Sequence, residues 1–374
     1  MIYRSFTKDS LKASQLGFGC MRFPTKKAEN KEVVDREKAT EMLRHAYENG
    51  VNYFDTAYFY HDGESEVVLG QALAGIREKV YIADKYPTGY TKDEHSMEKI
   101  LDEQLARLQT DYIDFYMLHG IGKGCIKTIQ TFGLIKKAEE LKAKGKIKYF
   151  GFSFHDNYDA FVELIDLYDQ WDFVQIQYNY LDENNQAGTK GLEYAHSKGL
   201  SVIIMEPLRG GALSNVPDDV SKLLIDFNPN RTPTNWALSW LWDKKEVSVI
   251  LSGMSTLDQV RENIKTAETA EIGDFSTAEQ QVIQEVYREY EKRIKVNCTD
   301  CKYCMPCPKG VDIPWNFKIL NNDYRYNIKS RWQYHAEKNK ATNASNCVAC
   351  GVCEKKCPQK IEISKHLQDM AKVY

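Results

Sequence analysis

Short apolar runs alternate with longer amphipathic stretches over residues 17–268. Eight of these runs are rich in Val, Ile, Phe and Tyr, as strands buried on both faces should be. The predicted strands are 16–20, 53–57, 80–85, 113–119, 149–154, 173–178, 201–206 and 248–253. The stretches between them have the length and periodicity of helices. The predicted helices are 38–48, 65–74, 96–108, 134–144, 158–168, 189–197, 234–242 and 256–267.

Eight β–α units in roughly 250 residues fit a (β/α)8 barrel, an α/β fold with parallel strands. A doubly wound open sheet is the alternative, but no Gly-x-Gly-x-x-Gly follows the first predicted strand. One charged helix is predicted over 277–295, and the composition changes abruptly after residue 296. We therefore expect a barrel over 1–275, a connecting helix over 276–296 and a small, mainly helical domain over 297–374.

Polar residues stand at the ends of three consecutive predicted strands. Asp55 ends the second strand with Tyr60 in its loop, Lys85 ends the third, and His119 ends the fourth. Barrel enzymes place their chemistry at these strand ends. A buried lysine beside an aspartate stays protonated and lowers the pKa of a neighbouring tyrosine, which favours proton donation. Each residue alone could be structural, but four together predict an acid–base site.

The pattern resembles the aldo/keto reductase family over about residues 1–290. The motifs that carry the resemblance are Phe54-Asp55-Thr56-Ala57, Tyr60, Gly63-x-Ser65-Glu66, Gly70, Lys85, Leu118-His119, Gly151-x-Ser153, Gln175, Pro207-Leu208-x-Gly210-Gly211 and Glu262-Asn263. The resemblance implies reduction of an aldehyde or ketone by a nicotinamide cofactor. Tyr60 would then give the proton, Lys85 and Asp55 would tune Tyr60, and His119 would orient the carbonyl.

The same resemblance implies a set of cofactor-binding residues. Ser153 and Gln175 would hold the carboxamide, Tyr178 would stack near the nicotinamide ring, and 208–213 would cover the pyrophosphate through backbone amides. The full expected set is Gly19, Cys20, Met21, Ser153, Gln175, Tyr178, Pro207, Leu208, Gly210, Gly211, Leu213, Gly253, Gln259, Glu262 and Asn263.

The sequence departs from the family pattern at three positions. Phe154 stands where the family often has Asn after the strand-5 serine. Gly253 and Gln259 stand where many members place a Lys and an Arg to grip a 2′-phosphate. NADP and NAD therefore both remain open, and Arg261 lies close enough in sequence to compensate.

Eight of the ten cysteines fall between residues 298 and 357, a crowding that indicates metal ligation. They form two Cys-x2-Cys-x2-Cys runs, each followed by a Cys-Pro. The runs resemble bacterial-type ferredoxins, in which the fourth Cys ligates the other cluster. Two [4Fe–4S] clusters are predicted, with zinc as the alternative. Their ligands would be Cys298, Cys301, Cys304 and Cys357 for one, and Cys347, Cys350, Cys353 and Cys307 for the other.

The composition is that of a globular protein, with 43% hydrophobic and 28% charged residues. No apolar run reaches 18 residues and no signal-peptide pattern follows Met1, so a cytoplasmic protein that does not enter a membrane is expected. The net charge of −3 divides into +6 over 296–374 and −9 over the rest. Negatively charged clusters would offset the basic tail, so no nucleic-acid partner is expected.

The leading hypothesis is an NAD(P)H-dependent carbonyl reductase that carries two clusters and acts on a small carbonyl substrate. A nicotinamide gives two electrons as a hydride, whereas a cluster takes one. The tail could therefore be a structural or docking module, an electron relay to a redox partner protein, or a sensor. The alternative hypothesis is an electron-transfer or redox-partner protein whose barrel binds ligand without carbonyl turnover.

Overall fold

The computed structural model describes residues 1–6, 11–28, 31–326 and 331–374. Internal contacts divide the chain into two compact units. The first comprises Met1–Gly211 and Thr234–Ser276, and the second comprises Ala212–Pro233 and Thr277–Tyr374. In the part of the chain that the structure describes, no helix is long and apolar enough to cross a membrane.

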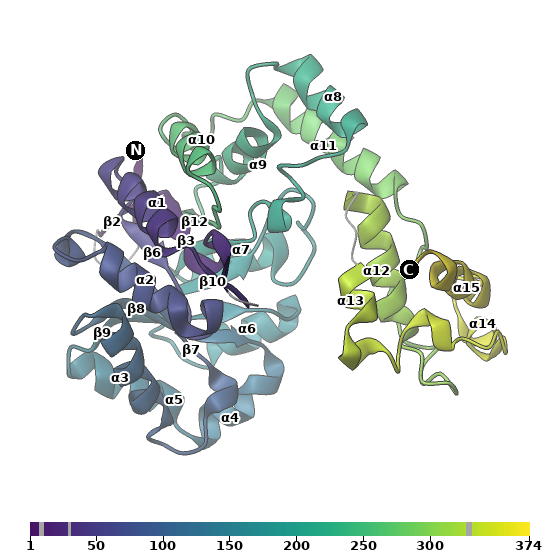
Figure 1. Cartoon of the computed structure of the whole chain (residues 1–374), viewed down its shortest axis with the longest axis horizontal. Coiled ribbons are helices and arrows are strands. Elements are labelled where there is room, and N and C mark those ends of the chain that lie inside the picture. The colour runs from purple at the N-terminus through teal and green to yellow at the C-terminus, as the bar shows by residue number, and fades with distance from the viewer. Residues whose placement is uncertain (7–10, 29–30, 327–330) are drawn as a thin grey trace. The chain divides into compact units, whose positions relative to one another are not determined.

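The first unit is a closed barrel of eight parallel strands, which confirms the predicted fold class (Figure 1). Each predicted strand is present, with its ends shifted by at most two residues. The strands are β3 (Leu16–Gly19), β6 (Tyr53–Asp55), β7 (Tyr81–Tyr86), β8 (Ile113–Ile121), β9 (Ile147–Phe154), β10 (Phe173–Gln177), β11 (Ser201–Met205) and β12 (Val247–Ser252).

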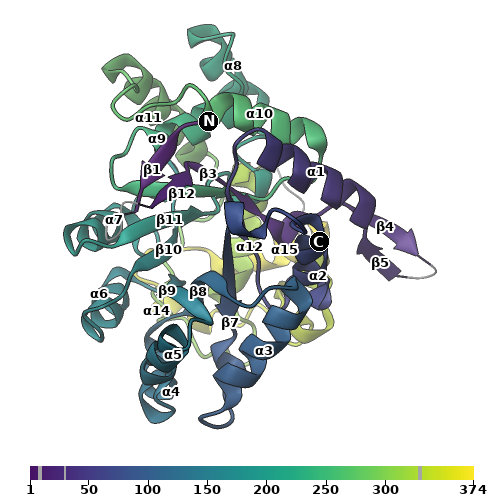
Figure 2. The ribbon, with the colours of Figure 1, turned by 90° about the vertical axis from the view of Figure 1, so that its left-hand side faces the viewer.

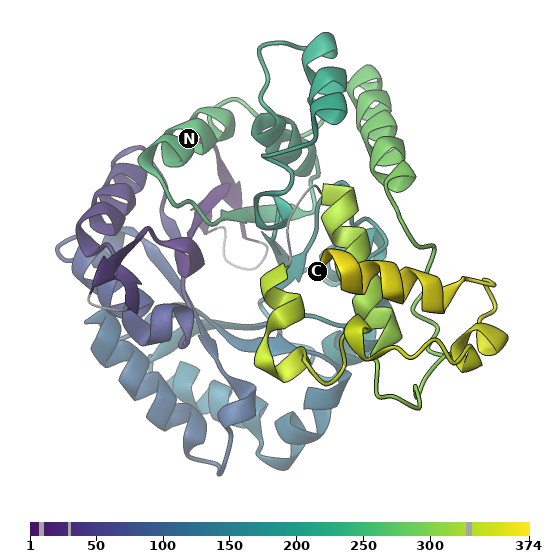
Figure 3. The same cartoon turned by 45° about the vertical axis from the view of Figure 1, so that its right-hand side comes forward.

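Helices surround this barrel, as Figure 3 shows. All eight predicted helices are found, and the short α4 was not predicted. Asn157 and Thr256 accept backbone N–H groups at the starts of α6 and α10, which stabilises those first turns. The helices are α1 (Arg36–Glu48), α2 (Glu64–Ala72), α3 (Ser96–Leu108), α4 (Ile126–Thr131), α5 (Leu134–Ala143), α6 (Tyr158–Asp166), α7 (Gly188–Ser197), α9 (Pro233–Trp242) and α10 (Leu257–Ala267).

Two hairpins accompany the barrel. The first pairs β1 (Tyr3–Ser5) with β2 (Lys12–Ser14), and the neighbouring Phe6 packs on Phe115 inside the barrel at 4.9 Å between ring centroids. The second pairs β4 (Thr25–Ala28) with β5 (Lys31–Val34) and stands out from the barrel (Figure 2). The second hairpin was not predicted, because its strands are rich in exposed lysines rather than apolar residues.

The second unit is mainly helical. Its helices are α8 (Asp218–Phe227), α11 (Thr277–Lys292), α12 (Ile313–Tyr326), α13 (Arg331–His335), α14 (Val352–Lys356) and α15 (Ile363–Val373). α8 packs against α11, and an Arg231–Glu279 ion pair of 2.5 Å joins their segments. Residues 212–233 therefore group with the C-terminal unit, whereas boundaries drawn in sequence order put them in the barrel.

The core of this second unit contains cysteine side chains. Buried residues such as Ile313, Phe317 and Leu367 form its centre, with the buried Cys353 among them. Five other cysteines pack against this centre as partly buried groups, namely Cys298, Cys304, Cys307, Cys347 and Cys357. The predicted cluster ligands are thus part of the packing of the unit.

Candidate functional site

A buried ion pair joins the ends of two adjacent barrel strands. Asp55 closes β6 and Lys85 lies near the end of β7, and the two strands pair with Asp55 opposite Ala83. Lys85 Nζ lies 2.6 Å from Asp55 Oδ1 and also donates to the Thr56 carbonyl at 2.5 Å. Both side chains are almost fully buried. The strand register therefore fixes this pair at the carboxyl end of the barrel.

Tyr60 and His119 lie beside this pair. Lys85 Nζ is 5.0 Å from the centroid of the Tyr60 ring. The His119 ring, on β8, meets the Tyr60 ring nearly edge-on, with 6.1 Å between centroids. The four residues singled out in the sequence as an acid–base set are thus brought together.

The pKa values of Lys85 and Asp55 are set by their burial and by the charges beside them. Burial lowers the pKa of Lys85, but the charges of Asp55 and Tyr60 and the Asp55 hydrogen bond outweigh it and raise the pKa to about 12. Burial raises the pKa of Asp55, and the Lys85 ammonium offsets part of that rise. Lys85 is therefore a fixed positive charge next to Tyr60 near neutral pH.

The remaining two residues are uncharged near neutral pH. Burial raises the pKa of Tyr60 above its usual value, and the Lys85 charge offsets only part of this rise. The sequence led us to expect that the Lys85 charge would lower the pKa of this tyrosine. The charge does act in that direction, but burial has the larger effect and the pKa is raised. Burial, with the charges of Lys85 and His155, lowers the pKa of His119 to about 3. His119 is thus a neutral imidazole that can donate one hydrogen bond.

The loop that carries Tyr60 has an unusual backbone. Tyr60 begins a short 3-10 turn, η2 (Tyr60–Gly63), in which His61, Asp62 and Gly63 all have positive φ angles. Arg107 on α3 supports this loop, because it pairs with the buried Glu66 at 2.7 Å and a Cβ on Gly63 would lie 3.0 Å from it. Sequence reasoning missed Arg107, since nothing in α3 marks one arginine as different from the other exposed charges.

Ser153 and Gln175 are neighbours across β9 and β10, in direct register. The Ser153 hydroxyl accepts the Gly120 N–H at 2.7 Å and donates to the Leu118 carbonyl through a long hydrogen bond of 3.5 Å. The Gln175 Oε1 atom is buried and has no hydrogen-bond partner among the described residues. A buried acceptor without a partner is costly. This pair therefore fits a ligand amide that donates to Gln175.

Three expected cofactor residues follow β3. Gly19 pairs with Asp55 across β3 and β6, Cys20 is fully buried, and Met21 is 58% exposed. Burial and the Asp55 charge raise the pKa of the Cys20 thiol, so it remains protonated. Cys20 therefore acts in packing, whereas Met21 presents an apolar side chain to solvent.

Tyr178 follows β10 and is fully buried. Its ring packs on Trp240 of α9 at 5.4 Å between centroids, and its hydroxyl bonds to Thr189 at 2.8 Å. This packing against the helix layer argues against the stacking role that the family resemblance implied.

The loop after β11 turns sharply. Pro207 is buried, Leu208 is half-buried, and Gly210 and Gly211 have φ angles of 67° and 98° that favour glycine. Arg209 in this loop forms an ion pair with Asp182. Leu213, the last residue of the expected pyrophosphate cover, groups with the second unit.

The remaining expected residues follow β12. The exposed Gly253 lies at its end, and the Gln259 Oε1 accepts the Ser255 N–H at 2.8 Å. Glu262 is half-buried on α10. Asn263 donates to the Ser252 hydroxyl at 2.8 Å, and its Oδ1 is buried without a hydrogen-bond partner in the described part of the chain. Asn263 is thus a second buried acceptor open to a ligand donor.

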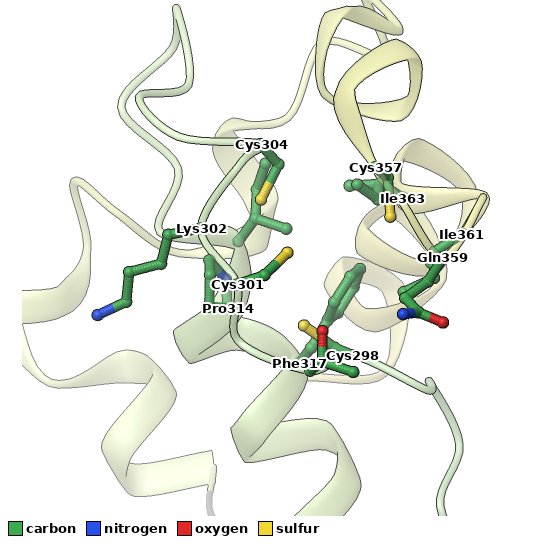
Figure 4. Close-up of a pocket in the computed structure, with 12 residues that line it drawn as sticks. Cys298, Cys301, Lys302, Cys304, Pro314, Phe317, Cys357, Gln359, Ile361 and Ile363 are labelled. Atoms are coloured by element: carbon green, nitrogen blue, oxygen red, sulfur yellow. The ribbon is translucent and has the colours of Figure 1, made fainter. Parts of the chain in front are cut away.

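In the second unit, four cysteines line one pocket. They are Cys298, Cys301, Cys304 and Cys357, the set that the resemblance to ferredoxins assigned to one cluster. Figure 4 shows their sulfur atoms around a shared space. Phe317, Ile313 and Ile361 supply apolar walls. Two cysteine runs 40 or more residues apart in sequence therefore meet at one site.

The two cysteine runs share one backbone conformation. Positive φ angles occur immediately before and after the second cysteine of each run, at Asp300 and Lys302 in one and at Ala349 and Gly351 in the other. In each run, the N–H two residues after the first cysteine donates to that cysteine's sulfur, at 3.4 Å for Ala349. The sequence could not reveal this equivalence, because three of the four left-handed residues are not glycine.

The second predicted ligand set spans several environments. Cys353 is buried, Cys347 and Cys307 are partly buried, and Cys350 is exposed. Burial raises the pKa of the Cys353 thiol. Among the described residues, no three His, Cys, Asp or Glu side chains converge closely enough to hold a single metal ion.

Comparison with known proteins identifies both parts of the chain. Residues 15–287 match the aldo/keto reductase family, and residues 297–362 match a 4Fe-4S dicluster domain. L-galactose dehydrogenase of Arabidopsis thaliana is 29% identical over 281 residues, covering 70% of this chain and 86% of that protein. The NADH-specific methylglyoxal reductase of Escherichia coli is 27% identical over 277 residues, covering 62% of this chain and 83% of that protein.

A solved structure extends the comparison to the fold. The holo form of an aldo-keto reductase from Bacillus halodurans aligns with a TM-score of 0.63 and 29% identity, over 76% of this chain and 96% of that one. The shared fold and the family match cover the barrel with its four clustered side chains. The chain therefore belongs to the aldo/keto reductase family of oxidoreductases and continues into a 4Fe-4S dicluster domain.

Proposed function

We propose that the barrel reduces a small aldehyde or ketone with NADPH or NADH, and that the C-terminal unit holds two [4Fe–4S] clusters. The observation that carries the first part is the buried Lys85–Asp55 pair, 2.6 Å apart, beside Tyr60 and the neutral His119. A fixed cation, a proton donor and a neutral hydrogen-bond donor meet there at the carboxyl end of a barrel.

The bound nicotinamide would supply a hydride to the carbonyl carbon. Tyr60 gives its phenolic proton to the carbonyl oxygen, so that the product is an alcohol. The resulting phenolate lies beside the Lys85 ammonium, which stabilises the developing negative charge. His119 donates a hydrogen bond to the carbonyl oxygen and orients it. Asp55 keeps Lys85 in place and protonated.

The fit to a nicotinamide rests on unsatisfied buried atoms. Gln175 Oε1 would accept an amide N–H, and the neighbouring Ser153 hydroxyl would exchange its long 3.5 Å bond to the Leu118 carbonyl for one to the amide oxygen. Asn263 Oδ1 is a further acceptor beyond the end of β12. These contacts suit the carboxamide and the adenosine portion of a dinucleotide.

The proposed class of substrate rests on the proton-donating site and on the compounds for which two relatives are named. One relative is named for L-galactose and another for methylglyoxal, both small oxygenated compounds. The proposed substrate is accordingly a small, polar carbonyl compound. The second relative is named as NADH-specific, so both NADH and NADPH belong in any assay.

Each proposed cluster has four cysteine ligands. One cluster is held by Cys298, Cys301, Cys304 and Cys357, and the other is held by Cys347, Cys350, Cys353 and Cys307. Four cysteine side chains line one pocket, but no three such groups among the described residues converge closely enough for a single metal ion, which suits a cubane better than zinc with its ligands at about 2.3 Å. The matching backbone of the two runs supports two equivalent sites. Bound clusters would supply or accept single electrons.

The test is turnover by anaerobically reconstituted full-length protein, with NADPH or NADH and a panel of small aldehydes and ketones. Tyr60→Phe should lower kcat by about 10²- to 10⁴-fold, the usual contribution of a general acid, without weakening dinucleotide binding. Tyr58→Phe is the matched control, because the Tyr58 hydroxyl bonds to the exposed Glu103.

Two outcomes would contradict the proposal. If Tyr60→Phe keeps its turnover, Tyr60 is not the proton donor. If the protein turns over no carbonyl compound at all, an electron-transfer protein is favoured instead. Iron and sulfide analysis checks the clusters, with about eight of each expected per chain. One zinc and no sulfide would refute them.

A further inference from the structure

One arginine at the carboxyl end of the barrel lies between two of the glycines described above. Arg22 ends the short turn η1 (Cys20–Arg22) that follows β3. Its alkyl stem lies against Gly253, where an added Cβ would be 3.2 Å from Arg22 Cδ. Its guanidinium reaches Gly210, where an added Cβ would be 3.4 Å from Nη2. Arg22 therefore joins the loops that follow β3, β11 and β12.

The β12 loop holds the backbone of Arg22. The Ser255 hydroxyl donates to the Arg22 carbonyl at 2.8 Å. Ser255 is itself fixed, because its N–H donates to the Gln259 side chain at 2.8 Å. Gln259, one of the three departures from the family pattern, thus supports the position of Arg22.

The charge of Arg22 is not neutralised by the protein. The side chain is exposed, and its guanidinium forms no ion pair with any described residue. The two other arginines near this end differ: Arg209 pairs with Asp182, and Arg261 pairs with Asp258 on its own helix at 3.2 Å. Arg261, which the sequence offered as a compensating cation, is therefore already partnered.

Gly253 makes room for Arg22. Any side chain at position 253 would start 3.2–3.5 Å from Arg22 Cβ, Cγ and Cδ and would compete for the same space. A side chain at position 253 would therefore press on the stem of Arg22, which would have to move by a few tenths of an ångström. Arg22 thus places a cation beside position 253, where the family resemblance led us to expect a lysine.

We propose that Arg22 binds a phosphate group of the nicotinamide dinucleotide, over the backbone of Gly210 and Gly253. This inference rests on the proposed function of the barrel. A guanidinium can bind two phosphate oxygens at once through its fork of N–H groups. In the neighbouring loop, Gly210 and Gly211 have positive φ and no side chain, so a phosphate can approach the backbone there closely. Its place beside Gly210 favours the pyrophosphate over the 2′-phosphate.

The test is equilibrium binding of NADPH and of NADH to the cluster-loaded full-length protein, followed by the fluorescence of the reduced nicotinamide. Arg22→Ala should raise Kd by about ten- to hundredfold, the usual loss for a charged hydrogen-bond partner. Arg22→Lys should recover part of the affinity, because it restores the charge but not the fork. Gly253→Ala should weaken binding in the same direction by displacing Arg22.

Arg44→Ala is the control, because Arg44 lies on the outer helix α1 and donates to the Ala74 carbonyl at 2.7 Å, so both Kd values should stay unchanged. Equal losses for NADPH and NADH with Arg22→Ala support pyrophosphate binding, and a loss for NADPH alone supports 2′-phosphate binding. Wild-type affinity for both dinucleotides in Arg22→Ala overturns the inference. Wild-type protein that binds neither overturns the proposed function instead.

Discussion

The two units of this protein hold their proposed reactive groups in opposite ways. In the barrel, Asp55 and Lys85 stand on hydrogen-bonded strands in fixed register and already contact each other. In the second unit, most of the cysteines stand on loops, and α14, the helix that carries Cys353, has only five residues. The first site is therefore built by the fold, whereas the second depends on what the cysteines bind.

Packing sharpens this difference. Barrel residues such as Lys85 and Gln175 are buried by neighbouring strands and helices, independently of any cofactor. The core of the second unit instead includes cysteine side chains that would be cluster ligands. Because metal binding and folding are coupled in small metal-binding domains, we expect the two units to respond differently when the clusters are removed.

The largest expected effect follows from removing iron with a chelator. Structural metal sites contribute on the order of 10 kcal/mol to folding, so residues 297–374 should lose most of their ordered structure. Hydrogen exchange should become fast over α12, α14 and α15 and stay slow over the barrel strands. Cys357→Ser should remove about four irons per chain.

Cys125→Ser is the control for that substitution, because Cys125 lies in the barrel unit outside both cysteine runs. Slow exchange retained over α12 and α15 after complete iron removal would show that the second unit folds without its clusters.

A smaller effect is expected from breaking the barrel ion pair. Lys85→Met leaves Asp55 buried without its partner and should lower the free energy of unfolding by about 3 kcal/mol. Asp55 then keeps a raised pKa in the folded state. Because the folded protein holds this proton more tightly than the unfolded chain does, the protein becomes less stable as the pH rises. Urea unfolding should therefore show a larger loss at pH 8 than at pH 5.

The double substitution Asp55→Leu with Lys85→Met should recover much of this stability, because no buried charge remains. An equal loss in the single and double variants would mean that packing rather than charge explains the effect.

The pH dependence of catalysis tests the electrostatics of the site. The pKa of Tyr60 is raised above 10 and that of His119 is lowered to about 3, so neither group titrates between pH 5 and about 9. Carbonyl reduction needs protonated Tyr60, and its kcat should be flat over this range. Alcohol oxidation needs the phenolate and should rise with pH. An alkaline fall in reduction near pH 7 would contradict this assignment.

The smallest expected effect concerns the cysteine loops. Gly351 has a φ of 70°, and a Cβ there would meet nothing within 4 Å, so Gly351→Ala should cost about 1 kcal/mol through the backbone alone. Ala349→Gly, at a φ of 53°, should be neutral or slightly stabilising. Urea unfolding of the cluster-loaded protein should therefore show a lower free energy of unfolding for Gly351→Ala but not for Ala349→Gly. An equal loss in both variants would argue against the left-handed backbone at these positions.

The sequence predicted the barrel well, because strands buried on both faces are apolar and short wherever they occur. It also predicted the cluster of Asp55, Tyr60, Lys85 and His119, since parallel strand ends share one edge. It could not predict the β4–β5 hairpin, whose strands are charged, or the packing of α8 on α11, which joins distant segments. Arg22 escaped notice because its importance depends on contacts with two glycines far away in sequence.

The origin of the hydrogen in the product tests the proposed barrel chemistry most directly. Reduced nicotinamide dinucleotide deuterated at the transferred C4 position would be incubated with the cluster-loaded protein and a carbonyl substrate. Direct hydride transfer predicts one deuterium on the new alcohol carbon by mass spectrometry, and a strong loss of product with Tyr60→Phe. A product whose new C–H hydrogen comes from solvent would contradict hydride transfer and would mean that electrons reach the substrate singly, through the clusters.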